Sequence, residues 1–222
     1  MSGAVASTGI VLAGGRSIRF GGDKLAVEVE GEPLLWRPIR ALAAAGCETI
    51  VVAIGRDHPT PTIPPGLAPA VEIVRDPVPD GGPLVGLRAG LAAAPSGIAI
   101  VVAGDQPELR PALLRSLVEA MGESVKAGLS GGRAPLAVVL VDPAGIARPL
   151  PCAVDRDEAL AAADRPLAGR DASLRALLRA LDAREVPELA WRRHDPDAAW
   201  TIDVDEPRDV ARPSPGRPTD GG

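Results

Sequence analysis

Aromatic residues are almost missing from this chain of 222 residues, which has no tyrosine, one phenylalanine and three tryptophans. Because 46% of the residues are nevertheless hydrophobic, we expect a core built from alanine, valine, leucine and isoleucine. The chain also lacks a stretch of about 18 consecutive apolar residues, which a membrane-spanning helix needs. The composition therefore predicts a globular protein without a membrane segment.

Cysteine and net positive charge are scarce as well. The two cysteines, Cys47 and Cys152, form no CxxC pair, which is typical of reduced structural thiols. The formal net charge of −5 argues against a general nucleic-acid binder, since that function needs a broad basic surface. The first residues, MSGAVASTG, lack the basic and long apolar segments of a secretory signal. We expect a cytoplasmic protein that binds neither nucleic acids nor membranes.

Short apolar segments alternate along the chain with longer segments rich in alanine and leucine. The pattern predicts strands at 10–12, 49–54, 71–74, 98–103, 136–141 and 200–204, and helices at 33–45, 83–94, 111–121, 155–163 and 172–181. This alternation predicts an α/β domain whose mostly parallel central sheet is covered on both faces. We place the domain at residues 1–211, and expect the Pro/Gly-rich residues 212–222 to form a disordered tail.

A glycine-rich segment follows the first predicted strand. Residues Leu12 to Lys24 read LAGGRSIRFGGDK and contain four glycines, two arginines and one lysine. Glycine allows close approach of the backbone to a ligand, and successive N–H groups in such a loop can surround an anion. Arg16, Arg19 and Lys24 add positive charge, so the segment predicts phosphate binding. It is not a Walker A sequence, because no Ser or Thr follows the lysine.

A carboxylate follows the predicted strand at 98–103. The six apolar residues lead into Gly104 and then Asp105. A charge at the tip of a buried strand is costly unless it has a partner, and Mg²⁺ suits this position because it takes one or two carboxylates and completes its shell with waters and substrate phosphates. Ligands of parallel sheets bind at the carboxyl ends of the strands, where the glycine-rich segment also lies. We predict that Asp105 binds Mg²⁺; the alternative is a cap of the turn or helix near Pro107.

Another acidic residue, Asp76, follows the predicted strand at 71–74. The segment GGPLVG at 81–86 then turns the chain into a helix, and a base, ribose or second substrate could lie against it. The alternative is a local Asx-type hydrogen bond of Asp76. We expect the neighbouring Arg75 either to contact substrate or to be solvated, and we expect His58, in a loop with five prolines, to face solvent.

Asp203 and Asp205 lie near the end of the chain and flank Val204. At strand spacing both side chains would point the same way, so the pair could hold a second cation or bind hydroxyls and amines of a substrate. The alternative for Asp205 is an N-cap of a short helix, with Pro207 in its first turn.

On these residues the chain resembles the nucleotidyltransferases, and more narrowly the molybdenum cofactor guanylyltransferase family. The family signature LAGG-x-S-x-R-[MF]-G-x-DK is matched throughout residues 12–24. The Asp76 segment, GGPLVGL (81–87), GDQPEL (104–109) and DVDEP (203–207) follow in the family's order. The resemblance implies a Rossmann-like three-layer sandwich of the nucleotidyltransferase type. This chain has Asp203 and Asp205 where family members often carry asparagine.

The resemblance also implies roles for individual residues. Nucleotide binding would involve Leu12, Ala13, Gly14, Gly15, Lys24, Asp76 and Asp105. Lys24 would contact the phosphates, Asp76 the nucleoside, and Asp105 would ligate Mg²⁺ as cofactor. Lys24, Arg19 and Asp105 would be the catalytic residues.

The activity that the resemblance implies is transfer of GMP from GTP to molybdopterin, with release of pyrophosphate. Maturation proteins of molybdoenzymes would then be candidate partners. Two alternatives stay open. One is a CTP-dependent molybdopterin cytidylyltransferase or a related NTP transferase, and the other is a non-catalytic nucleotide-binding maturation factor.

Overall fold

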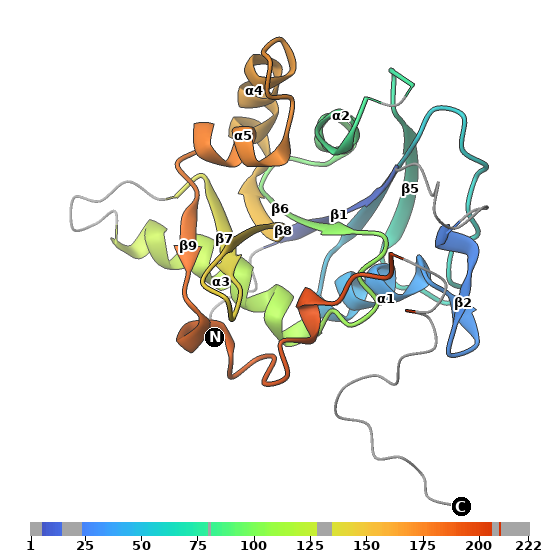
Figure 1. The fold of residues 1–222 in the computed structure, drawn as a ribbon, viewed down its shortest axis with the longest axis horizontal. Coiled ribbons are helices and arrows are strands. Elements are labelled where there is room, and N and C mark those ends of the chain that lie inside the picture. The colour runs from blue at the N-terminus through green and yellow to red at the C-terminus, as the bar shows by residue number, and fades with distance from the viewer. Residues whose placement is uncertain (1–5, 15–23, 80, 128–134, 206–208, 210–222) are drawn as a thin grey trace, which may run out of the picture.

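A computed structural model describes residues 6–14, 24–79, 81–127, 135–205 and 209 of this chain. Its centre is a seven-stranded sheet of order β5-β4-β1-β6-β8-β7-β9 (Figure 1). The strands are β1 (Ser7–Ala13), β4 (Thr49–Ile54), β5 (Ala70–Arg75), β6 (Ile98–Ala103), β7 (Ala137–Val141), β8 (Ala147–Asp155) and β9 (Arg184–Val186). Strand β8 is antiparallel to both neighbours, and every other adjacent pair is parallel. The predicted mostly parallel α/β sheet is confirmed.

Helices cover both faces of the sheet, so the sheet is the middle layer of a three-layer sandwich (Figure 1). They are α1 (Trp36–Ala45), α2 (Pro83–Ala93), α3 (Pro111–Ala127), α4 (Arg156–Leu167), α5 (Leu174–Ala180) and α6 (Glu188–Trp191). One buried cluster joins α1 and α3 to the sheet, and a second joins α2, α4 and α5 to the opposite face. These clusters consist mainly of alanine, valine, leucine and isoleucine, as expected from the scarcity of aromatic residues.

Local sequence explains where several helices begin and end. Helix α4 begins after Asp155, whose side chain accepts hydrogen bonds from the N–H groups of Asp157 (3.1 Å) and Glu158 (3.0 Å). Helix α1 ends at Gly46, which has a φ of 96° that glycine adopts without a Cβ penalty. Its start differs from the prediction, because residues before Trp36 form a small hairpin of β2 (Glu28–Val29) and β3 (Glu32–Pro33).

Two strand predictions need correction. Strand β8 was not predicted, because Pro149 and Pro151 lie within it and proline cannot donate to a sheet. The sheet accommodates them where the β7–β8 register shifts. The predicted strand at 200–204 is wrong: Ala199–Thr201 forms the 3-10 turn η3, and the following residues join no strand of the sheet that the structure describes. This C-terminal segment (199–205) instead packs against the end of β6.

Candidate nucleotide-binding site

The ends of strands β1 and β6 lie side by side. Leu12 pairs with Ala103, and the N–H of Gly104 donates to the carbonyl oxygen of Leu12 at 2.9 Å. A Cβ atom at Gly104 would lie 3.2 Å from that oxygen, so glycine allows this close approach. The following residues, Gly14 and Asp105, therefore leave neighbouring strands at the same edge of the sheet, as the sequence predicts.

Lys24 connects this edge to the C-terminal segment. Its Nζ lies 2.8 Å from Oδ2 of Asp105 and 3.2 Å from Oδ1 of Asp205. Only 12% of the Lys24 side chain is exposed. Burial, the largest single influence, lowers the pKa of Lys24, but the hydrogen bonds and attraction of Asp105 and Asp205 together outweigh it, so the pKa is raised. The Lys24 ammonium group is therefore firmly protonated.

Gln106 is a positioning residue that the sequence analysis missed. Its Oε1 accepts the N–H of Ala103 at 3.0 Å, and its Nε2 donates to the carbonyl oxygen of Trp200 at 3.1 Å. The N–H of Val204 also donates to the carbonyl oxygen of Asp105 at 3.0 Å. These bonds attach the C-terminal segment to the end of β6. The polar Gln106 within GDQPEL, directly after the metal-ligand candidate, was the available signal.

A cavity of about 210 Å³ opens beside these groups. Its lining residues are Ala103, Asp105, Gln106, Arg148, Pro149, Leu150, Trp200, Thr201, Asp203 and Asp205. Asp203 and Asp205 therefore share one cavity with Asp105. Loss of solvation in the cavity, followed by repulsion from Asp105 and Asp205, raises the pKa of Asp203 to about 6. Crowding of three carboxylates makes this cavity favourable for cations.

Arg148 lines the same cavity as these carboxylates and is held by a turn. Its Nε is 2.9 Å from Oδ2 of Asp142. The other Asp142 oxygen, Oδ1, accepts the N–H groups of Ala144 and Ile146, each at 2.9 Å. The bond from Ile146 contributes most to a lowered pKa of Asp142, and Arg148 contributes further. Asp142 thus orients the guanidinium group toward the cavity wall.

Asp76 lies buried between two glycines and has only 7% of its surface exposed. A Cβ atom at Gly14 would lie 3.4 Å from its Oδ2, and one at Gly86 would lie 3.2 Å from its Oδ1. Oδ1 has no hydrogen-bond partner among the described residues. Burial raises the pKa of Asp76, and the nearby His58 partly opposes this shift. Asp76 is thus a buried acceptor that lacks a local partner at Oδ1.

The loop after β4 differs from the sequence expectation at His58. His58 is half-buried rather than solvent-facing, because its ring packs on Gly55, where an added Cβ would lie 3.3 Å from the ring. Arg75 binds this loop: Nη1 donates to the carbonyl oxygens of Arg56 (3.0 Å) and His58 (2.7 Å). Its Nη2 donates to Oγ1 of Thr60 at 2.9 Å. Arg75 therefore fixes the loop beside Asp76.

The remaining predicted site residues divide into two groups. Leu12 and Ala13 are buried in β1, so only their backbone groups could contact a nucleotide. Gly15, Arg16 and Arg19 lie outside the described residues. Within the described ranges, no group of three or more His, Cys, Asp or Glu residues is arranged to hold a metal. No helix in the described part of the chain has the length and apolar character to cross a membrane.

Comparison with known proteins places the fold and the sequence in one family. Residues 9–186 match the model of the MobA-like NTP transferase domain. A probable molybdenum cofactor guanylyltransferase from Chloroflexus aggregans is 32% identical over 205 residues, which cover 91% of each chain. A molybdenum cofactor guanylyltransferase from Xanthomonas euvesicatoria is 39% identical over 112 residues, covering 50% of this chain and 53% of the relative.

Solved structures share the same fold. The crystal structure of molybdopterin-guanine dinucleotide biosynthesis protein A from Archaeoglobus fulgidus superposes with a TM-score of 0.66 at 20% identity, over 91% of this chain and 94% of the other. A nucleotidyl transferase from Methanothermobacter superposes with a TM-score of 0.64 at 21% identity, over 92% and 94% of the two chains. The chain therefore belongs to the MobA-like NTP transferase family and is a nucleotidyltransferase.

Proposed function

We propose that this protein transfers GMP from GTP to molybdopterin and releases pyrophosphate. The observation that carries this proposal is the convergence of Lys24 and Asp105 at the strand edge from which Gly14 also emerges. This combination supplies a cation and a carboxylate at the strand end where the glycine-rich segment begins, as phosphoryl-group transfer requires. The identity of the nucleotide and of the acceptor rests on the names of the relatives.

The reaction needs no nucleophile from the protein. An oxygen of the terminal phosphate of the acceptor attacks the α-phosphorus of GTP in line. A new phosphoanhydride bond forms while the bond from the α-phosphorus to the bridging oxygen of the β-phosphate breaks, and pyrophosphate leaves. Catalysis then comes from positioning of the two phosphates and from neutralisation of their charge.

Lys24 supplies a positive charge directly beside Asp105. Its protonated Nζ would donate to oxygens of the β- and γ-phosphates, which compete with Asp105 and Asp205 for the same ammonium group. Lys24 would thus stabilise the charge that develops on departing pyrophosphate. We propose that Arg19, from the same glycine-rich segment, contributes further charge there.

The donor set at the end of β6 fits Mg²⁺. Asp105 offers a partly exposed carboxylate, and Asp203 and Asp205 share its cavity. Mg²⁺ prefers a site with only one or two protein carboxylates and with room for water and phosphate oxygens. When bound, Mg²⁺ would polarise the α-phosphoryl oxygen and neutralise phosphate charge. Asp105 would hold it, while Gln106 keeps the end of β6 attached to the C-terminal segment.

Asp76 would bind the nucleoside. Its unpartnered Oδ1 is buried beside Gly86, and its Oδ2 lies near Gly14. A buried carboxylate oxygen without a partner is costly, so an N–H or O–H donor of the ligand would relieve that cost. Arg75 and the loop it binds would then form the wall of the nucleoside site.

The test is a competition between GTP and CTP in the presence of molybdopterin and Mg²⁺, read out as pyrophosphate release. We expect faster release with GTP, no release after chelation of divalent cations, and no turnover by Asp105→Ala. Preference for CTP would contradict the guanylyl assignment. Nucleotide binding without pyrophosphate release, with acceptor present, would indicate a non-catalytic factor instead.

A further inference from the structure

Lys24 is shared between two carboxylates that differ in exposure. Its Nζ lies 2.8 Å from Oδ2 of Asp105, whose side chain is 30% exposed, and 3.2 Å from Oδ1 of Asp205, whose side chain is 64% exposed. An ammonium group has three N–H donors, so these two contacts leave one donor. A polyphosphate that receives more than one hydrogen bond from Lys24 must therefore displace one of the two carboxylates.

Asp205 is the partner that is displaced at the lower cost. Its contact with Lys24 is the longer of the two, and its carboxylate is the more exposed. Exposed ion pairs contribute little free energy, because water readily solvates the freed carboxylate. Loss of a cation beside the less exposed Asp105 costs more, since that carboxylate regains less water. A phosphate oxygen would therefore replace Asp205, rather than Asp105, at Lys24.

The backbone holds Asp205 close to Lys24. The preceding residue, Val204, is only 2% exposed and packs in a small buried cluster. Its N–H donates to the carbonyl oxygen of Asp105 at 3.0 Å, and the N–H of Asp205 itself donates to Oδ2 of Asp209 at 3.0 Å. Because the backbone is bound on both sides, a displaced Asp205 carboxylate stays beside Lys24 at a high effective concentration.

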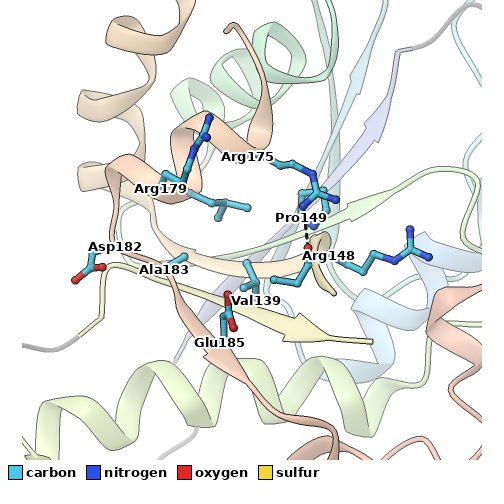
Figure 2. Close-up of a pocket in the computed structure, with 10 residues that line it drawn as sticks. Val139, Arg148, Pro149, Arg175, Arg179, Asp182, Ala183 and Glu185 are labelled. Atoms are coloured by element: carbon cyan, nitrogen blue, oxygen red, sulfur yellow. Dashed lines mark hydrogen bonds between the residues drawn. The ribbon is translucent and has the colours of Figure 1, made fainter. Parts of the chain in front are cut away.

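Arg148, a second cation at this cavity, is engaged elsewhere. It also lines a larger cavity, of about 400 Å³, between α5 and the strands β7, β8 and β9 (Figure 2). Figure 2 shows its side chain extending away from Arg175, and its Nε pairs with Asp142 at 2.9 Å. Among the residues that the structure describes, Asp205 forms an ion pair with Lys24 alone. Lys24 is therefore the charge to which a displaced Asp205 returns.

We propose that Asp205 is an internal competitor of polyphosphates for Lys24 and that it speeds the departure of pyrophosphate. The inference rests on the proposed function for the identity of this product. While phosphate oxygens bind Lys24, the Asp205 carboxylate is displaced. As pyrophosphate begins to leave, Asp205 returns to Lys24 and repels the departing anion. Asp205 thereby weakens binding of the product, whose release limits turnover in many enzymes.

The first experiment titrates inorganic pyrophosphate into the protein by calorimetry, without divalent cations, GTP or acceptor. We expect Asp205→Asn to lower the Kd about five-fold, the size of one exposed ion pair that no longer competes. Asp197→Asn is the matched control, because it removes the same charge and an ion pair with Arg110 (2.6 Å) just before the C-terminal segment. Its Kd should equal that of wild type. An unchanged Kd in Asp205→Asn, or equal tightening in both variants, would overturn the proposal.

A second experiment measures the rate at which bound pyrophosphate dissociates. We expect Asp205→Asn to slow this rate about five-fold and, in the full reaction, to lower the inhibition constant of pyrophosphate by the same factor. If Asp205→Asn instead weakens pyrophosphate binding when Mg²⁺ is present, Asp205 is a metal ligand and the proposal is overturned.

The titration also separates this inference from the proposed function. If wild-type protein releases no pyrophosphate from GTP with acceptor present, the proposed function fails, while tighter binding of pyrophosphate by Asp205→Asn would still support the competition at Lys24. If turnover is observed and the two Kd values are equal, the proposed function stands and the inference fails. Wild-type protein that binds no pyrophosphate would also overturn the inference.

Discussion

The Nζ atom of Lys24 lies 2.8 Å from Oδ2 of Asp105, although 81 positions separate the two residues in the chain. The same ammonium group reaches Asp205, which lies 181 positions away. Three distant segments thus meet at one charge centre at the carboxyl edge of the sheet. In the proposed reaction, Mg²⁺ would bind to Asp105 and the phosphates would bind to Lys24, so substrate binding would redistribute these ion pairs.

Replacement of Lys24 by alanine should lower kcat without unfolding the protein. Loss of one preorganised cation at the departing pyrophosphate corresponds to about 2–4 kcal/mol of transition-state stabilisation, or about 30- to 1,000-fold in rate. Pyrophosphate release under saturating substrates measures the effect. The thermal midpoint of the variant serves as the control for folding, and a kcat close to wild type would contradict the role assigned to Lys24.

Removal of Gln106 should weaken the attachment of the C-terminal segment. Gln106→Ala leaves the N–H of Ala103 and the carbonyl oxygen of Trp200 without their partner in a buried region. We expect a loss of about 1–3 kcal/mol in the free energy of unfolding. Urea denaturation measures this loss, and hydrogen exchange should accelerate at residues 199–205. Unchanged exchange there would show that other contacts hold the segment.

Arg75 should influence nucleotide binding through the loop that it holds. Arg75→Gln removes the guanidinium bonds to Arg56, His58 and Thr60. We expect the KM for GTP to rise about five- to ten-fold, while the KM for the acceptor stays constant. Arg88→Gln is a suitable control, because it removes an exposed ion pair with Asp164 of α4 and leaves the bonds of Arg75 to the loop intact. An equal rise in both KM values would argue against a specific nucleoside site.

Asp142 should make stability depend on pH in the acid range. Its pKa is lowered from 3.8 in the folded protein, so the unfolded chain binds a proton at a higher pH than the folded one. The stabilisation is therefore fully present above the unfolded value of about 3.8 and is lost as the pH falls through the lower folded value. Urea midpoints of Asp142→Asn and wild type should differ at neutral pH and converge in strong acid. A constant difference would contradict this linkage.

The two cysteines should resist thiol reagents in the folded protein. Burial raises the pKa of Cys47 to about 11 and that of Cys152 to about 12. At neutral pH almost no thiolate forms, and the thiolate is the reactive species. An aromatic disulfide reagent should therefore label neither thiol until denaturant is added, when both should react. Rapid labelling of one thiol without denaturant would reveal local opening around it.

Much of the sheet and part of the site could be predicted because their signals are local. Apolar segments such as Thr49–Ile54 and Ile98–Ala103 specify buried strands through the composition of a few adjacent residues. The glycine-rich segment and Asp105 each follow such a strand, so the rule for parallel sheets places both at one edge. Strand β8 escaped prediction because its prolines oppose the local signal, and only the pairing with β6 and β7 decides its conformation.

The predictions for Gly15 and Arg19 stay predictions, as do those for the limit of the domain at residue 211 and the tail at 212–222. The cytoplasmic location and the maturation partners also stay predictions.

The sequence by itself determined which groups are available: a glycine-rich loop, a lysine and strand-end carboxylates, encoded within short stretches of chain. Only the tertiary structure decided that Lys24 pairs with Asp105 and Asp205, that His58 packs on Gly55, and that Arg148 lines two cavities. Contacts between distant segments depend on strand register and on packing of the whole core, which no local pattern contains.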